Sequence, residues 1–172
     1  MIGRRPPEAA RRTVPGHREG DLITGAGNRS AIGTLVDCAS LFTILLHLPG
    51  RRHTAEAVAD ALVQARGRLP VQLRRSLTRD QGKEMALHAG ITQALSMPVF
   101  FCDPHSPWQR PASENTNGLL RRYFPKGSDL GCHAPERLAA VAAELNDRPR
   151  KALGWDTPAT RLAATLTEDS PS

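Results

Sequence analysis

Two acidic residues, Asp80 and Glu114, stand at expected boundaries of regular structure, and 33 residues separate them. Asp80 follows an apolar, strand-like run, and Glu114 opens an Asn-rich helix start. A third carboxylate, Asp21, lies near the start of another strand-like run. Two strands and a helix that carry three carboxylates can hold a pair of hard divalent cations, because Mg²⁺ and Mn²⁺ prefer oxygen ligands and keep positions open for phosphate and water. The trio therefore predicts phosphoryl transfer on nucleic acid.

Each carboxylate also has a simpler interpretation. Asp21 is consistent with an ordinary strand-edge acid, although an unpaired carboxylate in a central strand is costly. Asp80 before Gln-Gly is consistent with a turn residue, and Glu114 with a first-turn glutamate favoured by the helix dipole. Taken singly, these interpretations are preferable. Taken as a trio, the three residues favour a metal site.

Composition agrees with a nucleic-acid partner. The chain has 172 residues, enough for one α/β domain, and a net charge of +6, which suits a polyanion. Only 3 of its 23 basic residues are lysines. Such a preference for arginine fits phosphate binding and a GC-rich genome equally well. The chain lacks a long apolar run, a signal-type N-terminus and a Cys-x-x-Cys pair, so we expect a cytoplasmic protein without membrane, disulfide framework or zinc ribbon.

Hydrophobic periodicity and turn residues predict an alternation of strands and helices. We expect a basic, flexible lead-in over 1–16, a core domain over 17–166 and a disordered tail over 167–172. Within the core, the expected strands are 20–23, 31–36, 42–48, 76–79 and 98–102, and the expected helices are 54–67, 83–95, 114–124 and 136–146.

Several segments together resemble the catalytic domain of DDE transposases of the insertion-sequence-thirty family, in the retroviral-integrase-like superfamily. The resemblance covers about residues 5–162 and is carried chiefly by Glu19-Gly-Asp-Leu22, Asp80-Gln-Gly-Lys-Glu-Met85, Ser106-Pro-Trp-Gln-Arg110, Glu114-Asn-Thr-Asn-Gly-Leu-Leu-Arg121, Leu145-Asn146 and Arg148-Pro-Arg-Lys151. It implies that Asp21, Asp80 and Glu114 are the catalytic, metal-binding carboxylates.

The resemblance also implies a ribonuclease H-like α/β fold, with a five-stranded mixed sheet flanked by helices. In that fold the first and fourth strands are neighbours, so Asp21 and Asp80 would meet near the centre of the sheet. The implied activity is strand cleavage and strand transfer during transposition of an insertion sequence, with two Mg²⁺ or Mn²⁺ ions. The implied partners are double-stranded DNA, at transposon ends and target, and further copies of the chain.

Residues around the trio are candidates for DNA contact, each with an alternative. Lys83 is suited either to contact a phosphate or to be a solvated residue at a helix start. His105 is suited either to contact DNA or to be an ordinary loop residue. Trp108 is suited either to stack on a base or to pack its loop on the core. Asn115 and Asn117 suit backbone contacts or helix capping. Outside this group, Trp155 is expected to be a packing anchor. The remaining candidates, with a solvated charged surface as the alternative for the last three, are Arg110, Arg121, Arg122 and Lys126.

The chain departs from the family pattern at a few positions. Arg18 and Arg79 stand where Trp is usual, and Pro111-Ala-Ser113 stands where Gly-Thr-Asn is usual. Pro111 could displace Glu114 if the approach to its helix needs a glycine-only backbone. The family usually carries an N-terminal helix-turn-helix region, and this sequence opens after the point where that region would lie. The alternative function is therefore a truncated, catalytically weak transposase remnant that binds DNA or interferes with a full-length enzyme.

Overall fold

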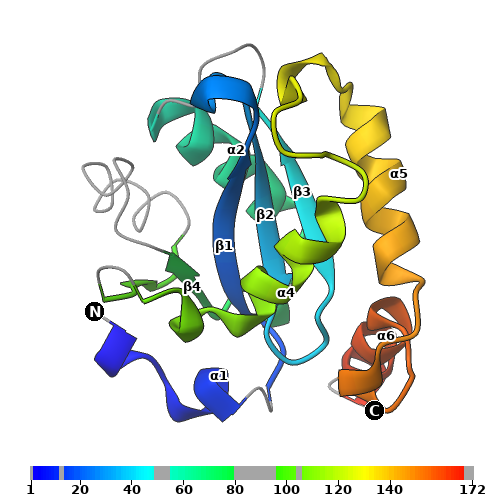
Figure 1. Cartoon of the computed structure of the whole chain (residues 1–172). Helices are drawn as coiled ribbons and strands as arrows, with labels where there is room; N and C mark the ends of the chain where they lie inside the picture. Colours follow the sequence, from blue (N-terminus) through cyan, green and yellow to red (C-terminus); the bar gives the residue numbers. More distant parts are fainter. Residues whose placement is uncertain (1, 12–13, 49–54, 80–95, 104–105, 169–172) are drawn as a thin grey trace.

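A computed structural model describes residues 2–11, 14–48, 55–79, 96–103 and 106–168 (Figure 1). Within these residues the strands are β1 His17–Thr24, β2 Ala31–Asp37, β3 Thr43–His47, β4 Ser76–Arg79 and β5 Val99–Phe101. The α-helices are α1 Pro7–Arg11, α2 Ala55–Gly67, α4 Pro111–Leu120, α5 Pro135–Asn146 and α6 Pro158–Glu168. The helix expected over 83–95 and the end of the expected tail, residues 169–172, lie outside the described residues.

The strands form one mixed sheet with the order β3-β2-β1-β4-β5. β1, β2 and β3 are an antiparallel meander, as their short connections predict. β4 is parallel to both β1 and β5, which requires longer crossovers, and α2 lies in the crossover that leads to β4. The expected adjacency of the first and fourth strands, and with it the five-stranded mixed sheet, is confirmed.

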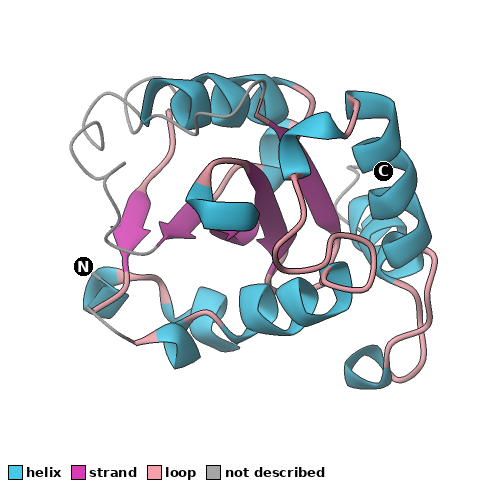
Figure 2. Cartoon of the chain, turned by 45° about the horizontal axis from the view of Figure 1, so that its top comes forward, coloured by secondary structure: helices cyan, strands magenta, loops and turns pink. Residues whose placement is uncertain are grey.

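Helices cover both faces of the sheet (Figure 2). On one face, α2 buries Val58, Leu62 and Ala65 in a core that it shares with the sheet. On the other face, α4 and α5 build a second core that includes Leu120 and Val141. No helix in the described ranges is long and apolar enough to cross a membrane.

The alternation of side chains along β1 directs its acidic residues toward one helix. Leu22 packs against the core on the α2 side, whereas Ile23 belongs to the core formed with α4 and α5. Because side chains on a strand alternate between the two faces, Glu19 and Asp21 share the face of Ile23. Both carboxylates therefore point to the side of the sheet that α4 covers.

Two segments contain helices that the sequence analysis did not expect. The lead-in includes α1, whose Glu8 Oε1 lies 2.9 Å from His17 Nε2, while His17 Nδ1 lies 2.6 Å from Ser76 Oγ. This buried histidine explains why β1 begins at His17, earlier than expected. The second missed helix is α6. In addition, α4 begins at Pro111, before the expected start at Glu114, because proline is well suited to the first position of a helix.

Arg18 is a buried charge on the face of β1 opposite to Glu19. The side chain is 1% exposed, and within the described residues none of its three guanidinium nitrogens has a hydrogen-bond partner. Burial lowers the pKa of Arg18, although Asp37 on the neighbouring strand opposes this shift. Asp37 itself accepts hydrogen bonds from Gly16 N, Ser40 N and Ser40 Oγ, so it does not depend on Arg18. Arg18 therefore carries a desolvation cost without the bonds that usually offset it.

We predict that Arg18→Met stabilises the fold. An unbranched apolar side chain of similar length removes the buried charge, and such replacements are neutral or stabilising by about 1–4 kcal/mol. The free energy of unfolding in urea measures the effect, with Arg122→Met, at an exposed position just after α4, as the control. A clear loss of stability in Arg18→Met alone would show that the guanidinium has a compensating partner.

Candidate active site

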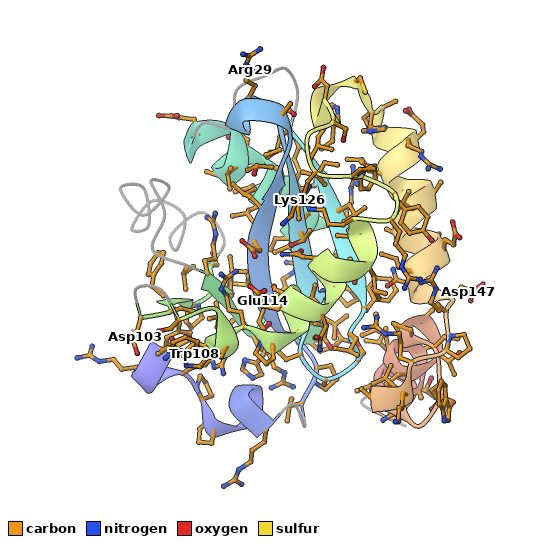
Figure 3. The ribbon with its side chains drawn as sticks, viewed as in Figure 1. Arg29, Asp103, Trp108, Glu114, Lys126 and Asp147 are labelled. Atoms are coloured by element: carbon orange, nitrogen blue, oxygen red, sulfur yellow. The ribbon has the colours of Figure 1, made fainter. Side chains whose placement is uncertain are left out.

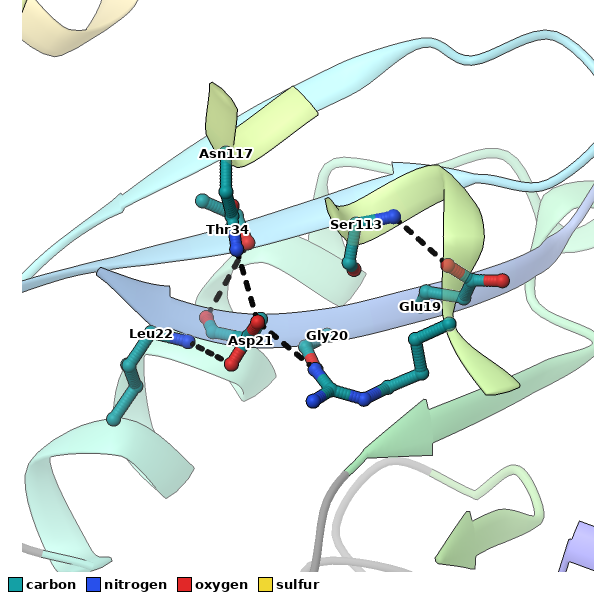
Figure 4. Close-up of polar contacts among 8 residues, drawn as sticks. Glu19, Gly20, Asp21, Leu22, Thr34, Ser113 and Asn117 are labelled. Carbon is teal, nitrogen blue, oxygen red and sulfur yellow. Dashed lines mark hydrogen bonds and ion pairs between the residues drawn. The ribbon is translucent and has the colours of Figure 1, made fainter. Parts of the chain in front are cut away.

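Asp21 is held by three nitrogen donors (Figure 4). Its Oδ2 lies 3.0 Å from Arg110 Nη1 and accepts a hydrogen bond from Asn117 Nδ2 at 2.9 Å. Its Oδ1 accepts a hydrogen bond from the backbone N–H of Leu22 at 2.8 Å. The side chains of Asp21 and Arg110 are 16% and 6% exposed, so this ion pair is largely shielded from water. The carboxylate is therefore fixed in orientation at the edge of the protein interior.

Glu19 holds the beginning of α4 (Figure 4). Its Oε2 accepts a hydrogen bond from the backbone N–H of Ser113 at 2.8 Å, and its Oε1 accepts from Cys38 Sγ at 3.7 Å. The residue before the helix, Arg110, makes no side-chain cap. Glu19, which is 2% exposed, thus supplies from β1 the acceptor and the negative charge that a helix N-terminus requires.

The sequence analysis did not identify Glu19 as a functional residue. The signal was its position two residues before Asp21 in the same strand, because this spacing places both acids on one face. Glu19 does not replace Asp21 as a metal-binding candidate. Its two oxygens are engaged within the fold, and its contact to α4 positions the helix that carries Glu114.

Glu114 and Asn117 are three residues apart on α4, so they share one side of the helix, and Arg110 immediately precedes the helix. Arg110 and Asn117 both contact Asp21, which shows that this side faces β1. Glu114 lies between them in the sequence, in the first turn of α4, and is exposed (Figure 3). Pro111 occupies the start of the helix, a position that proline suits, and the hypothesis that it displaces Glu114 stays a prediction.

The described part of the site fits a hard divalent cation in its donor chemistry. Asp21 and Glu114 supply carboxylate oxygens from facing elements, and Asn117 orients Asp21 as a second layer of contacts would. Within the described residues, no three His, Cys, Asp or Glu side chains converge on one point. Asp80, Lys83 and His105 lie outside the described residues.

The side chains predicted to contact DNA fall into two groups. Arg110 and Asn117 contact Asp21, and Arg121 Nη1 donates to the carbonyls of Thr24 and Phe124, so these three serve internal contacts. The second group is exposed, and Figure 3 labels two of its members; it consists of Trp108, Asn115, Arg122 and Lys126.

Trp108 and Trp155 are both at the surface, with exposed fractions of 71% and 66%. The interpretation of Trp108 as a residue that packs its loop on the core is therefore wrong, and so is that of Trp155 as a packing anchor. Trp155 follows Gly154 in a turn where both have positive φ, which turns the tryptophan outward. Leu153 is the buried residue of that turn.

A thiol adjoins the Asp21–Arg110 pair. Cys102 follows β5 and is 2% exposed. Burial raises the pKa of the Cys102 thiol, and the neighbouring Arg110 guanidinium acts in the opposite direction. The thiol is consequently neutral at neutral pH, so Asp21 is the carboxylate partner that balances the Arg110 charge in this contact.

We predict that Glu19→Ala destabilises the protein by about 1–3 kcal/mol. The substitution leaves the buried Ser113 N–H without its acceptor and removes the negative charge from the α4 N-terminus. Chemical unfolding measures this loss. Glu136→Ala, which removes an exposed first-turn glutamate of α5, is the control and should change stability by less than about 1 kcal/mol. Equal effects of the two variants would contradict the assigned role of Glu19.

Comparison with known proteins gives a consistent set of relatives. The chain is 51% identical over 165 residues to the transposase for insertion sequence element IS1086 of Cupriavidus metallidurans, covering 94% of this chain and 47% of the relative. It is 50% identical over 143 residues to the transposase InsI for IS30C of Escherichia coli, covering 83% and 37%. It is 37% identical over 155 residues to the transposase for IS4351 of Bacteroides fragilis, covering 90% and 47%.

The chain thus spans about half the length, or less, of these relatives. No profile of a known protein family matches it. Among solved structures, it resembles a chain of the simian T-cell lymphotropic virus intasome in complex with PP2A regulatory subunit B56 gamma, with a TM-score of 0.60 and 20% identity. That match covers 77% of this chain and 49% of the other, and it confirms the ribonuclease H-like fold.

Proposed function

We propose that this chain, whose homologues are transposases of the insertion-sequence-thirty family, carries a DDE-type catalytic centre for metal-dependent cleavage and joining of DNA strands. The observation that carries the proposal is the contact between β1 and α4: Asp21 on β1 contacts Asn117 on α4 and Arg110 just before it, and Glu114 lies in the first turn of the same helix. Carboxylates on two facing elements can share a cation.

Asp80 is the third carboxylate of the proposed centre. β4 lies beside β1, with Thr78 paired to Glu19, and it ends at Arg79. Asp80 is the next residue in the sequence, so the end of β4 leads toward the level of Asp21. This support comes from the direction and register of β4, while Asp80 itself lies outside the described residues.

The residues of the chain have separate tasks in the proposed reaction. Asp21, Asp80 and Glu114 would hold two Mg²⁺ or Mn²⁺ ions, which supply an activated oxygen nucleophile and stabilise the leaving oxygen. Asn117 orients Asp21, and Glu19 fixes the start of α4 and hence the position of Glu114. Precise placement matters because a shift of about 1 Å can cost on the order of a hundredfold in rate.

Double-stranded DNA is the proposed substrate. The net charge of +6 favours a polyanionic partner. Near Glu114 in the sequence are four exposed side chains that suit contacts with phosphates or bases: Trp108, Asn115, Arg122 and Lys126. Association of several copies on the DNA is part of the proposal. The transposase homologues favour this catalytic function over the alternative of a catalytically weak remnant that only binds or interferes.

We predict that the purified protein nicks supercoiled DNA with Mg²⁺ or Mn²⁺ but not with Ca²⁺. Asp21→Asn and Glu114→Gln should each lower the nicking rate by at least about a hundredfold, because each removes a charged oxygen ligand. Glu136→Gln, at an exposed position on α5, is the matched control and should nick like the wild type. Equal nicking by all four proteins would assign the cleavage to a contaminant.

We also predict that binding to duplex DNA depends weakly on sequence and steeply on salt. Each phosphate contact contributes a slope of about −0.9 to the plot of log K against log salt concentration. Arg122→Gln and Lys126→Gln should each remove one phosphate contact and so make the slope less negative by about 1. Arg68→Gln, at an exposed position after α2 on the other face of the sheet, should leave the slope unchanged. A slope unaffected by both α4-side variants would remove this surface from the DNA interface.

A further inference from the structure

The Asp21 oxygen that faces α4 already has two nitrogen donors. Arg110 Nη1 lies 3.0 Å from Oδ2, and Asn117 Nδ2 lies 2.9 Å from the same atom. The other oxygen, Oδ1, accepts from Leu22 N at 2.8 Å. A carboxylate oxygen has two lone pairs, so Oδ2 in this arrangement has no lone pair left for a cation. One of its two donors has to leave before Oδ2 can bind a cation, whereas Oδ1, with a single donor, keeps one lone pair.

Of the two donors, Arg110 is the one that a cation displaces. Asn117 is neutral, so it does not repel a cation. Carboxylates that bind a metal commonly accept hydrogen bonds from neighbouring side chains as well, so Asn117 can stay in place. Arg110 carries a full positive charge on a side chain that is only 6% exposed. In such a poorly solvated position, it repels a divalent cation at short range. The guanidinium and the metal are therefore alternative counter-ions of the same carboxylate oxygen.

The exchange leaves the start of α4 in place. Arg110 precedes the first helical residue, and the start of the helix is fixed independently by the hydrogen bond from Ser113 N to Glu19. The guanidinium gives up further contacts in the exchange: Nη1 lies 3.3 Å from the carbonyl oxygen of Gly20, which is long for a hydrogen bond, and the side chain interacts with the Cys102 thiol.

We infer that Arg110 is a positioning residue that neutralises and orients Asp21 in the metal-free protein and competes with the divalent cation for Asp21 Oδ2. Arg110 thereby keeps the site ordered before metal binding, and it lowers the apparent metal affinity in proportion to the fraction of time that Oδ2 is free of it. The inference rests on the proposed function, because it requires Asp21 to be a metal ligand. It assigns to Arg110 a regulatory role at that site instead of a contact to DNA.

The test is Mn²⁺ binding to the DNA-free protein, measured from the electron paramagnetic resonance signal of free Mn²⁺. If Arg110 occupies Oδ2 about nine-tenths of the time, Arg110→Gln should bind Mn²⁺ roughly tenfold more tightly than the wild type. Arg137→Gln removes the same charge from an exposed position on α5 and is the matched control, expected to change the affinity by less than about threefold.

Thermal unfolding provides a second readout that does not depend on catalysis. Without metal, Arg110→Gln should melt at a lower temperature than the wild type, because Asp21 loses its counter-ion. Saturating Mn²⁺ should raise its melting temperature by more than it raises that of the wild type. Arg110→Lys, which keeps a positive charge but loses the guanidinium fork, should bind Mn²⁺ with intermediate affinity, and it replaces Arg110→Gln if the latter does not fold.

The outcomes separate this inference from the proposed function. Mn²⁺ binding that is lost in Asp21→Asn but is equal or weaker in the Arg110 variants, compared with the wild type, overturns the inference and leaves the metal site standing. Absence of Mn²⁺ binding in the wild type and in all variants overturns both. Tighter binding in Arg110→Gln, with Arg137→Gln unchanged, supports both.

Discussion

The connection between β1 and the start of α4 is the contact on which the site depends. Glu19 accepts a hydrogen bond from Ser113 N, and Asp21 accepts from Arg110 and Asn117 on the same helix. Because the two acids are two residues apart in a strand, one face of β1 supplies both contacts. The helix that carries Glu114 is thus fixed to the central strand of the sheet by carboxylates, while its apolar side is held by the core around Leu120.

Several charged residues lie buried around β1, and they are balanced unequally. The Asp21–Arg110 pair is compensated by further hydrogen bonds, as a shielded ion pair must be. Arg18, on the opposite face of the same strand, is less exposed and has no such bonds within the described residues. The Asp21–Arg110 charges are thus compensated by hydrogen bonds at the candidate site, whereas the Arg18 charge lowers the stability of the fold. The two faces of β1 therefore differ in how their buried charges are compensated.

The order of elements could be predicted from local patterns, whereas several boundaries could not. The meander, α2 and the limits of β4 follow from apolar periodicity and turn residues, and the structure confirms them. The early start of β1 at His17 depends on Ser76 and on Glu8 of α1, which are distant in sequence or in an unexpected element. The first turn of α4 before Glu114 was missed because the group that caps it, the Glu19 carboxylate, lies on β1, far away in the sequence.

The sequence by itself determined the candidates for the chemistry: Asp21 and Glu114 were identified from residue type, spacing and flanking motifs. Only the tertiary structure decided what surrounds them, because side-chain partners depend on which elements meet. Arg110 was expected at the DNA and lies instead against Asp21. Trp155 was expected inside and lies at the surface, since a turn with positive φ directs it outward. Local sequence fixes periodicity and charge, but long-range packing decides which charges face each other.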